Sequence, residues 1–155
     1  MASDIDRQKQ ELYELLDLQP SETLNVVIVG GGKGIGLGFT EYFASMGANI
    51  QIASSSAAPV AADRLNGRYQ SSQIEGRRVN FADPTDVDNY LNLPELQSFF
   101  RETHITIFAA GMGVADNPFG GESGTVGEML AIKRDGAFQF NQFFAGVMKV
   151  RGESI

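Results

Sequence analysis

A cluster of six glycines directly follows the short β-branched run 24–29: Gly30, Gly31, Gly32, Gly34, Gly36 and Gly38. Residues 39–46 after the cluster are predicted to be helical, and Gly47 is a natural residue to end that helix. A strand that runs into glycines and then into a helix leaves backbone N–H groups free at the helix N-terminus, where the helix dipole also favours negative charge. The cluster therefore predicts a site for a phosphate or pyrophosphate.

The spacing of these glycines decides which of three phosphate-binding motifs the loop matches. A Walker A loop is excluded because Lys33 is followed by Gly34 and not by Ser or Thr. The strict G-x-G-x-x-G motif fails in every register, but G-x-x-x-G-x-G fits at Gly30, Gly34 and Gly36. We expect Gly30 to allow a sharp exit from the strand, Gly34 to let phosphates approach the backbone, and Gly36 to let the helix pack close to the sheet. The alternative is a tight turn without a ligand, and the strand and helix on either side favour dinucleotide binding over it.

The chain resembles the short-chain dehydrogenase/reductase family from about Asn25 to its C-terminus. The family loop T-G-x-x-x-G-I-G corresponds to V-G-G-G-K-G-I-G at 29–36, and the family D-x-T-D corresponds to D-P-T-D at 83–86. Two later motifs are partly kept: F-A-A-G at 108–111 stands for N-N-A-G, and K-R-D-G-A-F at 133–138 stands for N-x-x-G-x-F. The resemblance implies that the loop binds the cofactor through Gly30, Gly32, Lys33, Gly34, Ile35 and Gly36. It also implies contacts from Ala110 and Gly111 and places Asp83 beside the adenine, although a helix cap alone is an equally good interpretation of Asp83.

The fold that these patterns predict is α/β, a Rossmann-like, doubly wound parallel sheet. Strands are expected at 24–29, 49–53, 77–82 and 105–109, alternating with helices near 39–46, 58–65, 83–101 and 126–148. Residues 1–22 form an amphipathic helical extension, capped by Ser3 and Asp6 and stopped by Pro20, and residues 23–155 form the dinucleotide-binding domain. The sequence ends where the fifth strand would begin, so we expect a sheet truncated at that point.

The residues around the second strand favour NADP over NAD. An NAD site usually offers a carboxylate to the ribose about 20 residues after the glycines, but no acid lies between Glu41 and Asp63. Ser54 and Ser55, at the end of that strand, can donate hydrogen bonds to a 2′-phosphate. Lys33 stands where NADP-using members of the family carry a basic residue, although an exposed loop lysine is the alternative.

The catalytic residues of the family are missing from this chain. Family members use Tyr-x-x-x-Lys to protonate the reduced carbonyl, whereas the residues four positions after each tyrosine are Asp17, Met46, Gln73 and Pro94. The sequence therefore predicts the NADP(H)-binding portion of a reductase, inactive alone and with no catalytic residue. The alternatives are a non-catalytic dinucleotide-binding regulatory module and an interaction protein that has lost the ligand.

The expected truncation also predicts a partner. An uncovered strand edge and four phenylalanines on the last helix favour a homo-oligomer or a complementing chain: Phe138, Phe140, Phe143 and Phe144.

Composition excludes several other classes of function. The chain has 155 residues, enough for one domain, and a net charge of −7, which disfavours nucleic acid as a partner. It has no cysteine and a single histidine, His104, which excludes disulfide scaffolds and Cys or His metal sites. His104 is expected to be structural or exposed. Without a membrane span or a secretory signal, a soluble cytoplasmic protein is expected.

Overall fold

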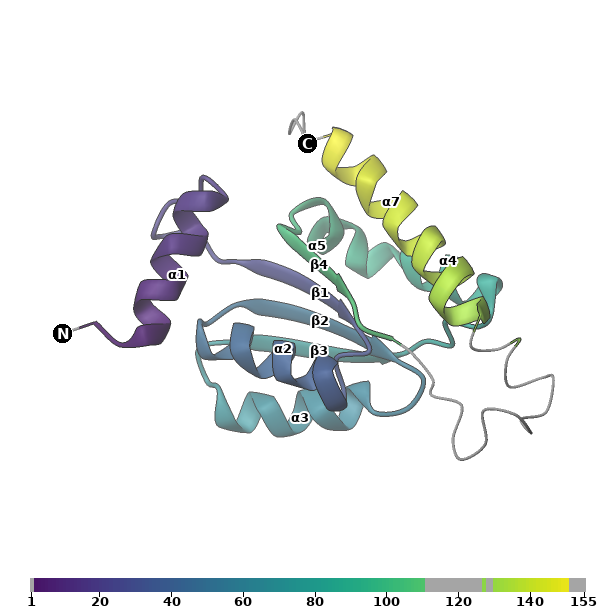
Figure 1. Cartoon of the computed structure of the whole chain (residues 1–155), viewed down its shortest axis with the longest axis horizontal. Helices are drawn as coiled ribbons and strands as arrows, with labels where there is room; N and C mark the ends of the chain where they lie inside the picture. Colours follow the sequence, from purple (N-terminus) through teal and green to yellow (C-terminus); the bar gives the residue numbers. More distant parts are fainter. Residues whose placement is uncertain (1, 111–126, 128–129, 151–155) are drawn as a thin grey trace.

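The computed structural model describes residues 2–110, 127 and 130–150, and it contains a four-stranded parallel sheet (Figure 1). The strands are β1 (Asn25–Val29), β2 (Asn49–Ser54), β3 (Gln73–Arg78) and β4 (Ile105–Phe108), in the order β3-β2-β1-β4. The chain starts at the centre of the sheet, winds outward to β3, and returns to place β4 on the other side of β1. This order and the helices on both faces confirm the Rossmann-like α/β fold.

Alternate residues of the central strand β1 face two separate hydrophobic cores. Val26 and Ile28 belong to the core beneath α2 (Gly34–Ser45) and α3 (Ala58–Arg68). Val27 and Val29 belong to the core beneath α4 (Pro84–Leu91), α5 (Gln97–Arg101) and α7 (Ala137–Val150). All five residues of β1 are buried, which explains its nearly continuous run of β-branched residues.

Helix α1 (Asp4–Leu15) begins with the capping box predicted from the sequence. The Ser3 hydroxyl accepts a hydrogen bond from the Asp6 N–H at 3.2 Å, and the Ser3 N–H donates to the Asp6 carboxylate at 3.0 Å. Tyr13, which is 7% exposed, joins the core beneath α2 and α3. Its hydroxyl donates to the Glu22 carbonyl oxygen at 3.0 Å, so the segment after α1 is tied back to the helix.

The expected bounds were wrong for two elements. Strand β3 covers Gln73–Arg78 and not 77–82, because β3 lies at an edge of the described sheet and tolerates polar residues along its length. The apolar residues Val79 and Phe81, which suggested the later strand, follow β3 and pack in the core beneath α4. Helix α2 begins at Gly34, five residues before its predicted start, because three glycines are accommodated in its first turns.

The helical region after Asp83 is divided as Pro94 suggested. Helix α4 ends at Leu91, the short 3₁₀ helix η1 (Pro94–Leu96) follows, and α5 begins at Gln97. The last helical region contains a π-helical segment, η2 (Ala131–Gly136), directly before α7. Gly136 allows this π-helical segment to approach the chain that follows β3, because a Cβ there would lie 2.5 Å from the Phe81 carbonyl oxygen.

The expectation of an uncovered phenylalanine cluster was largely wrong. Phe140 and Phe144 are 0% and 2% exposed, because α7 lies over the sheet and packs Phe140 against Phe108, Phe144 against Phe100, and the two rings against each other. Phe143 is partly buried against Phe100, and Phe138 alone of the four is strongly exposed, at 68%. The prediction of an open strand edge fits the described sheet, where β4 is an edge strand and each of its residues is only partly buried.

Candidate functional site

The glycine loop begins with a turn that only glycine accommodates well. Gly30 has φ +81°, and its N–H donates to the Ala53 carbonyl oxygen at the end of β2, at 2.7 Å. A Cβ at Gly30 would lie 2.7 Å from the backbone nitrogen of Ala110, just after β4. The loop therefore leaves β1 between the carboxyl ends of its two neighbouring strands, where parallel α/β sheets bind ligands.

The first turn of α2 folds back onto the start of the loop. A Cβ at Gly36 would overlap the Gly30 carbonyl group, so the close contact that we expected between helix and sheet is made with the loop itself. The buried Thr40 hydroxyl lies 2.9 Å from the Gly31 carbonyl oxygen and 3.0 Å from that of Gly36. Sequence reasoning missed Thr40, whose position four residues after Gly36 is the spacing for such a bond to a helix carbonyl.

Gly32 has a packing role that its neighbours explain. A Cβ there would lie 2.7 Å from the backbone of Ala57, immediately before α3. The loop is therefore held between α3 on one side and the end of β4 on the other, in a fixed position relative to the sheet.

The opposite side of the loop is open. Lys33 is the N-cap residue of α2, its side chain is exposed, and it makes no capping hydrogen bond. Gly34 has φ +57°, and no atom of the described residues would lie within 4 Å of a Cβ placed on it. Ile35 is 80% exposed. Within the described part of the chain, the first N–H groups of α2 therefore face open space without a side-chain cap, which is the arrangement that binds anions at helix N-termini.

The serines after β2 lie beside this loop. Ser54 is half-buried, and its Oγ accepts a hydrogen bond from the Ala58 N–H at 2.9 Å, which stabilises the start of α3. Its hydroxyl hydrogen is left to donate elsewhere. Ser55 is exposed. Both follow Ala53, whose carbonyl accepts from Gly30, so the structure brings them to the same end of the sheet as the glycines.

Asp83 caps α4, as one interpretation of the sequence predicted. Its Oδ1 accepts from the Thr85 N–H at 2.9 Å, and its side chain is otherwise exposed after β3 at the carboxyl end of the sheet. A contact with adenine stays a prediction. Ala110 is partly buried next to Gly30, and Gly111 lies outside the described residues.

His104 lies at the other end of the sheet. Its Nδ1 accepts a hydrogen bond from the Asn25 N–H at 3.0 Å, where β1 begins. This bond gives His104 a structural role far from the glycine loop along β1. Across the described ranges, no group of three His, Cys, Asp or Glu side chains is placed to hold a metal ion. Within the same residues, no helix has the length and hydrophobicity of a membrane span.

Comparison with solved structures supports the fold. One similar structure is L-sorbose reductase from Gluconobacter frateurii, complexed with NADPH and L-sorbose, with a TM-score of 0.71 and 23% sequence identity. The match covers 84% of this chain and 49% of the reductase chain. A short-chain dehydrogenase from Sphingobium yanoikuyae in complex with NADPH gives 0.66 at 18% identity, with 84% and 51% covered. An alcohol dehydrogenase from Thermococcus sibiricus, complexed with 5-hydroxy-NADP, gives 0.70 at 19% identity, with 84% and 55% covered. The chain thus spans about half the length of these structures.

Comparison of the sequence with protein families gives a more specific result. No curated protein sequence matches the chain significantly. The family model described as short chain dehydrogenase matches residues 24–154, which include the glycine loop, all four strands and α7. The chain therefore belongs to the short-chain dehydrogenase family.

Proposed function

We propose that this chain binds NADP(H) at the carboxyl end of its sheet, as the dinucleotide-binding portion of a short-chain dehydrogenase/reductase. The observation that carries the proposal is the first turn of α2, which Lys33 leaves uncapped and which no other described residue obstructs at Gly34. The pyrophosphate binds there because free N–H groups and the helix dipole both stabilise negative charge. The family match and the NADP(H) complexes of structurally similar proteins support the same cofactor.

The roles of the other residues follow from their places in the site. Gly30, Gly32 and Gly36 keep the loop close to the sheet, and Gly34 and Ile35 contribute backbone N–H groups to the pyrophosphate. Asp83 contacts the adenine, and Ala110 and Gly111 border the nicotinamide ribose side of the site. The assignment of Gly111 rests on its motif alone, and those of the other residues rest on the motifs and on their positions at the carboxyl end of the sheet.

We infer a preference for NADP over NAD because a lysine follows the first strand and serine hydroxyls, with no carboxylate among them, follow the second. Lys33 is exposed beside the open turn, and no acid stands between Glu41 and Asp63. Ser55 is exposed and Ser54 keeps a free hydroxyl hydrogen, so both can donate to a 2′-phosphate. A carboxylate in their place would repel that phosphate.

This chain alone does not reduce carbonyl compounds in our proposal. No tyrosine is followed by lysine at the fourth position, so the proton for the developing alkoxide has no donor of the family type. Activity requires a proton donor supplied by further polypeptide, because a second copy of this chain lacks the same pair. A regulatory module that binds the dinucleotide without catalysis is the second candidate, and the same missing pair favours it.

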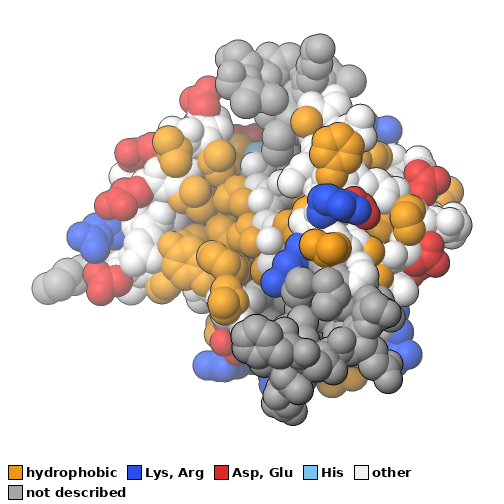
Figure 2. Space-filling view, turned by 45° about the vertical axis from the view of Figure 1, so that its right-hand side comes forward, with side chains coloured by type: hydrophobic (Ala, Val, Ile, Leu, Met, Phe, Trp, Pro, Cys, Tyr) orange, Lys and Arg blue, Asp and Glu red, His pale blue; other side chains and the backbone are white. Residues whose placement is uncertain are grey.

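Strand β4 and two exposed side chains of α2 are candidate contacts for such a partner. All four β4 residues are partly exposed, and Ile35 and Phe39 on α2 are 80% and 40% exposed. Hydrophobic side chains also gather on the face beside α1 (Figure 2). Large exposed apolar areas of this kind mark interaction surfaces.

Titration with NADPH and NADH tests the proposal. Wild-type protein is expected to bind NADPH more tightly, and Lys33→Ala to weaken NADPH binding about tenfold while NADH binding changes little, because one charge-assisted contact contributes about 1–2 kcal/mol. Arg64→Ala, on α3 and outside the loop, is the matched control for loss of a positive charge. If folded wild-type protein binds neither dinucleotide at millimolar concentration, the function is wrong. If Lys33→Ala weakens both equally, the preference for NADP is wrong.

A further inference from the structure

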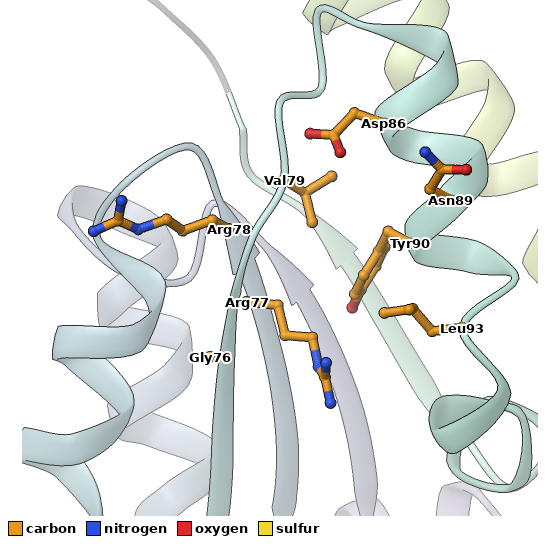
Figure 3. Close-up of a pocket in the computed structure, with 8 residues that line it drawn as sticks. All are labelled: Gly76, Arg77, Arg78, Val79, Asp86, Asn89, Tyr90 and Leu93. Atoms are coloured by element: carbon orange, nitrogen blue, oxygen red, sulfur yellow. The ribbon is translucent and has the colours of Figure 1, made fainter.

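A pocket of about 410 Å³ opens between β3 and α4, and none of its lining residues belongs to the glycine loop (Figure 3). Arg77 and Val79 contribute from β3 and the segment after it, and Asp86, Tyr90 and Leu93 contribute from α4 and its C-terminal end. The volume is within the range of small-molecule sites. The proposed dinucleotide site makes no use of these residues.

Two of the residues that line this pocket each carry a buried polar atom with no hydrogen-bond partner among the described residues. One is the hydroxyl of Tyr90, a residue that is 3% exposed, and the other is Nε of Arg77. They come from facing elements, and both point into the space between β3 and α4 in Figure 3. A buried donor without a partner is unfavourable, so two of them in one pocket indicate a group that completes their hydrogen bonds.

Both atoms are hydrogen-bond donors. Burial raises the pKa of the Tyr90 phenol, which therefore remains protonated. Nε of an arginine side chain is an N–H donor. The Arg77 Nη1 is paired with the Glu95 carboxylate at 3.1 Å, which leaves the Nε edge of the guanidinium for another oxygen. The ligand must therefore present an acceptor, and a carboxylate makes the strongest bonds to such donors.

The other end of the pocket carries a hydrogen-bond acceptor, the Asp86 carboxylate, where the first end carries donors. Asp86 in the first turn of α4 and Asn89 one turn later lie away from the Tyr90 hydroxyl and the guanidinium (Figure 3). Asp86 Oδ2 accepts a hydrogen bond from the Asn80 N–H at 2.6 Å, and its other carboxylate oxygen can accept from a ligand. Val79 and Leu93 provide apolar contacts between the two ends.

We propose that this pocket binds a small carboxylate that also carries a hydroxyl or amino group. Its carboxylate accepts hydrogen bonds from the Tyr90 hydroxyl and the Arg77 Nε, and its hydroxyl or ammonium group donates to Asp86. The two donor atoms have almost no solvent-exposed surface, so the Arg77 guanidinium shifts when the ligand enters. Its pairing with Glu95 permits this, because both side chains are partly exposed, at 33% and 53%, and such ion pairs are weak.

Thermal unfolding without any dinucleotide tests this proposal independently of the proposed function. The probes are sodium lactate and β-alanine, compared with sodium propionate, which lacks the second polar group, and with sodium chloride at equal ionic strength. A ligand at about ten times its Kd raises the melting temperature of a domain of this size by about 3–6 °C. We expect a saturable rise with lactate or β-alanine, a smaller one with propionate, and none with chloride.

Two variants locate the site. Tyr90→Phe removes only the hydroxyl, and Arg77→Lys keeps the charge but removes Nε; each is expected to weaken lactate or β-alanine binding at least tenfold. Arg78→Lys is the matched control, because the Arg78 side chain extends away from Tyr90 in Figure 3. Tyr90→Phe without ligand is expected to melt no lower than wild type, since its hydroxyl has no partner there. Equal shifts with chloride and the carboxylates, no shift with any probe, or unchanged binding by Tyr90→Phe would each overturn the proposal.

Discussion

Two glycines on the first turns of α2 are expected to respond in opposite ways to the same substitution. Gly36 and Gly38 are two residues apart on α2, and neither has a positive φ. A Cβ at Gly36 would lie 2.6 Å from the Gly30 carbonyl carbon, whereas no atom of the described residues lies within 4 Å of a Cβ at Gly38. Alanine at the two positions therefore separates close packing of the loop from the general effect of alanine in a helix.

The magnitude follows from the geometry at Gly36. Carbon atoms in contact lie about 3.5 Å apart or more, so Gly36→Ala must move the loop by about 1 Å. Gly30 resists that movement, because its N–H donates to the Ala53 carbonyl oxygen and its backbone lies close to the backbone of Ala110. Overpacking of this kind costs about 1–3 kcal/mol, or roughly 3–10 °C in melting temperature. Gly38→Ala removes only backbone freedom and is expected to stabilise by about 0.5–1 kcal/mol.

Thermal unfolding and calorimetric titration with NADPH measure both effects. Gly36→Ala is expected to remain folded but to lose at least about tenfold in affinity, since a displacement near 1 Å exceeds what a binding site tolerates. Gly38→Ala is expected to bind as wild type does and to melt at a higher temperature. Wild-type affinity in Gly36→Ala would refute the role assigned to the contact with Gly30. Equal loss of affinity in both variants would show that any side chain in this turn obstructs the ligand.

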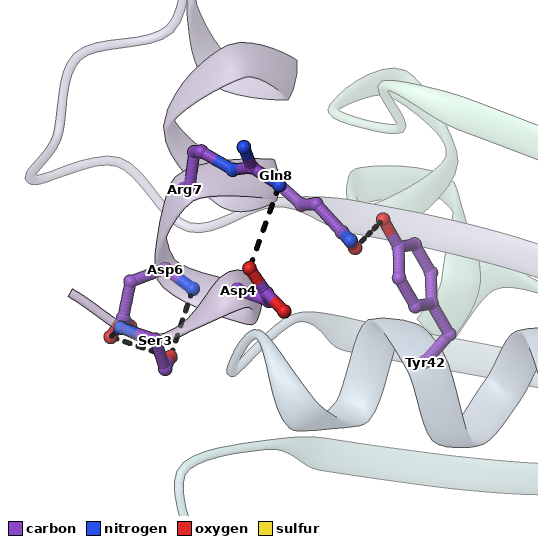
Figure 4. Close-up of polar contacts among 6 residues, drawn as sticks. All are labelled: Ser3, Asp4, Asp6, Arg7, Gln8 and Tyr42. Carbon is purple, nitrogen blue, oxygen red and sulfur yellow. Dashed lines mark hydrogen bonds and ion pairs between the residues drawn. The ribbon is translucent and has the colours of Figure 1, made fainter.

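Two further predictions concern the core and the N-terminal helix. Phe140→Ala is expected to cost about 3–5 kcal/mol in the free energy of unfolding because its ring is fully buried, while Phe138→Ala changes it by less than about 0.5 kcal/mol; urea titrations that give equal losses would contradict the packing of α7. The hydrogen bonds from Ser3 hold the pKa of Asp6 below its usual value (Figure 4). The ionised cap therefore stabilises α1 above the unfolded pKa, and this contribution is lost as the pH falls through the lower folded pKa. Hydrogen exchange in the first turn of α1 should accelerate in acid in wild type, relative to its intrinsic rate, and depend less on pH in Asp6→Asn.

Local features of the molecule could be predicted from the sequence because a few neighbouring residues determine them. The capping box of Ser3 and Asp6, the cap at Asp83 and the positive φ of Gly47 each depend on bonds within about four residues. The glycine loop is similar, since the turn at Gly30 requires a residue without a Cβ. Strand β1 was also predictable, because burial on both faces requires a continuous apolar run.

Other features depend on which distant segments meet. The polar sequence of β3 forms a strand because β2 pairs with it through backbone hydrogen bonds and because β3 lies at an edge of the described sheet. No pattern within β3 itself reveals this. The burial of Phe140 depends on the position of α7 over Phe108 and Phe100, and the role of Gly36 depends on the Gly30 carbonyl opposite it. Local hydrogen bonds and steric limits act within one turn of the chain, so neighbouring residues in the sequence are enough to predict them. Burial, close contacts and pockets arise between elements far apart in the sequence, so only the tertiary structure decides them.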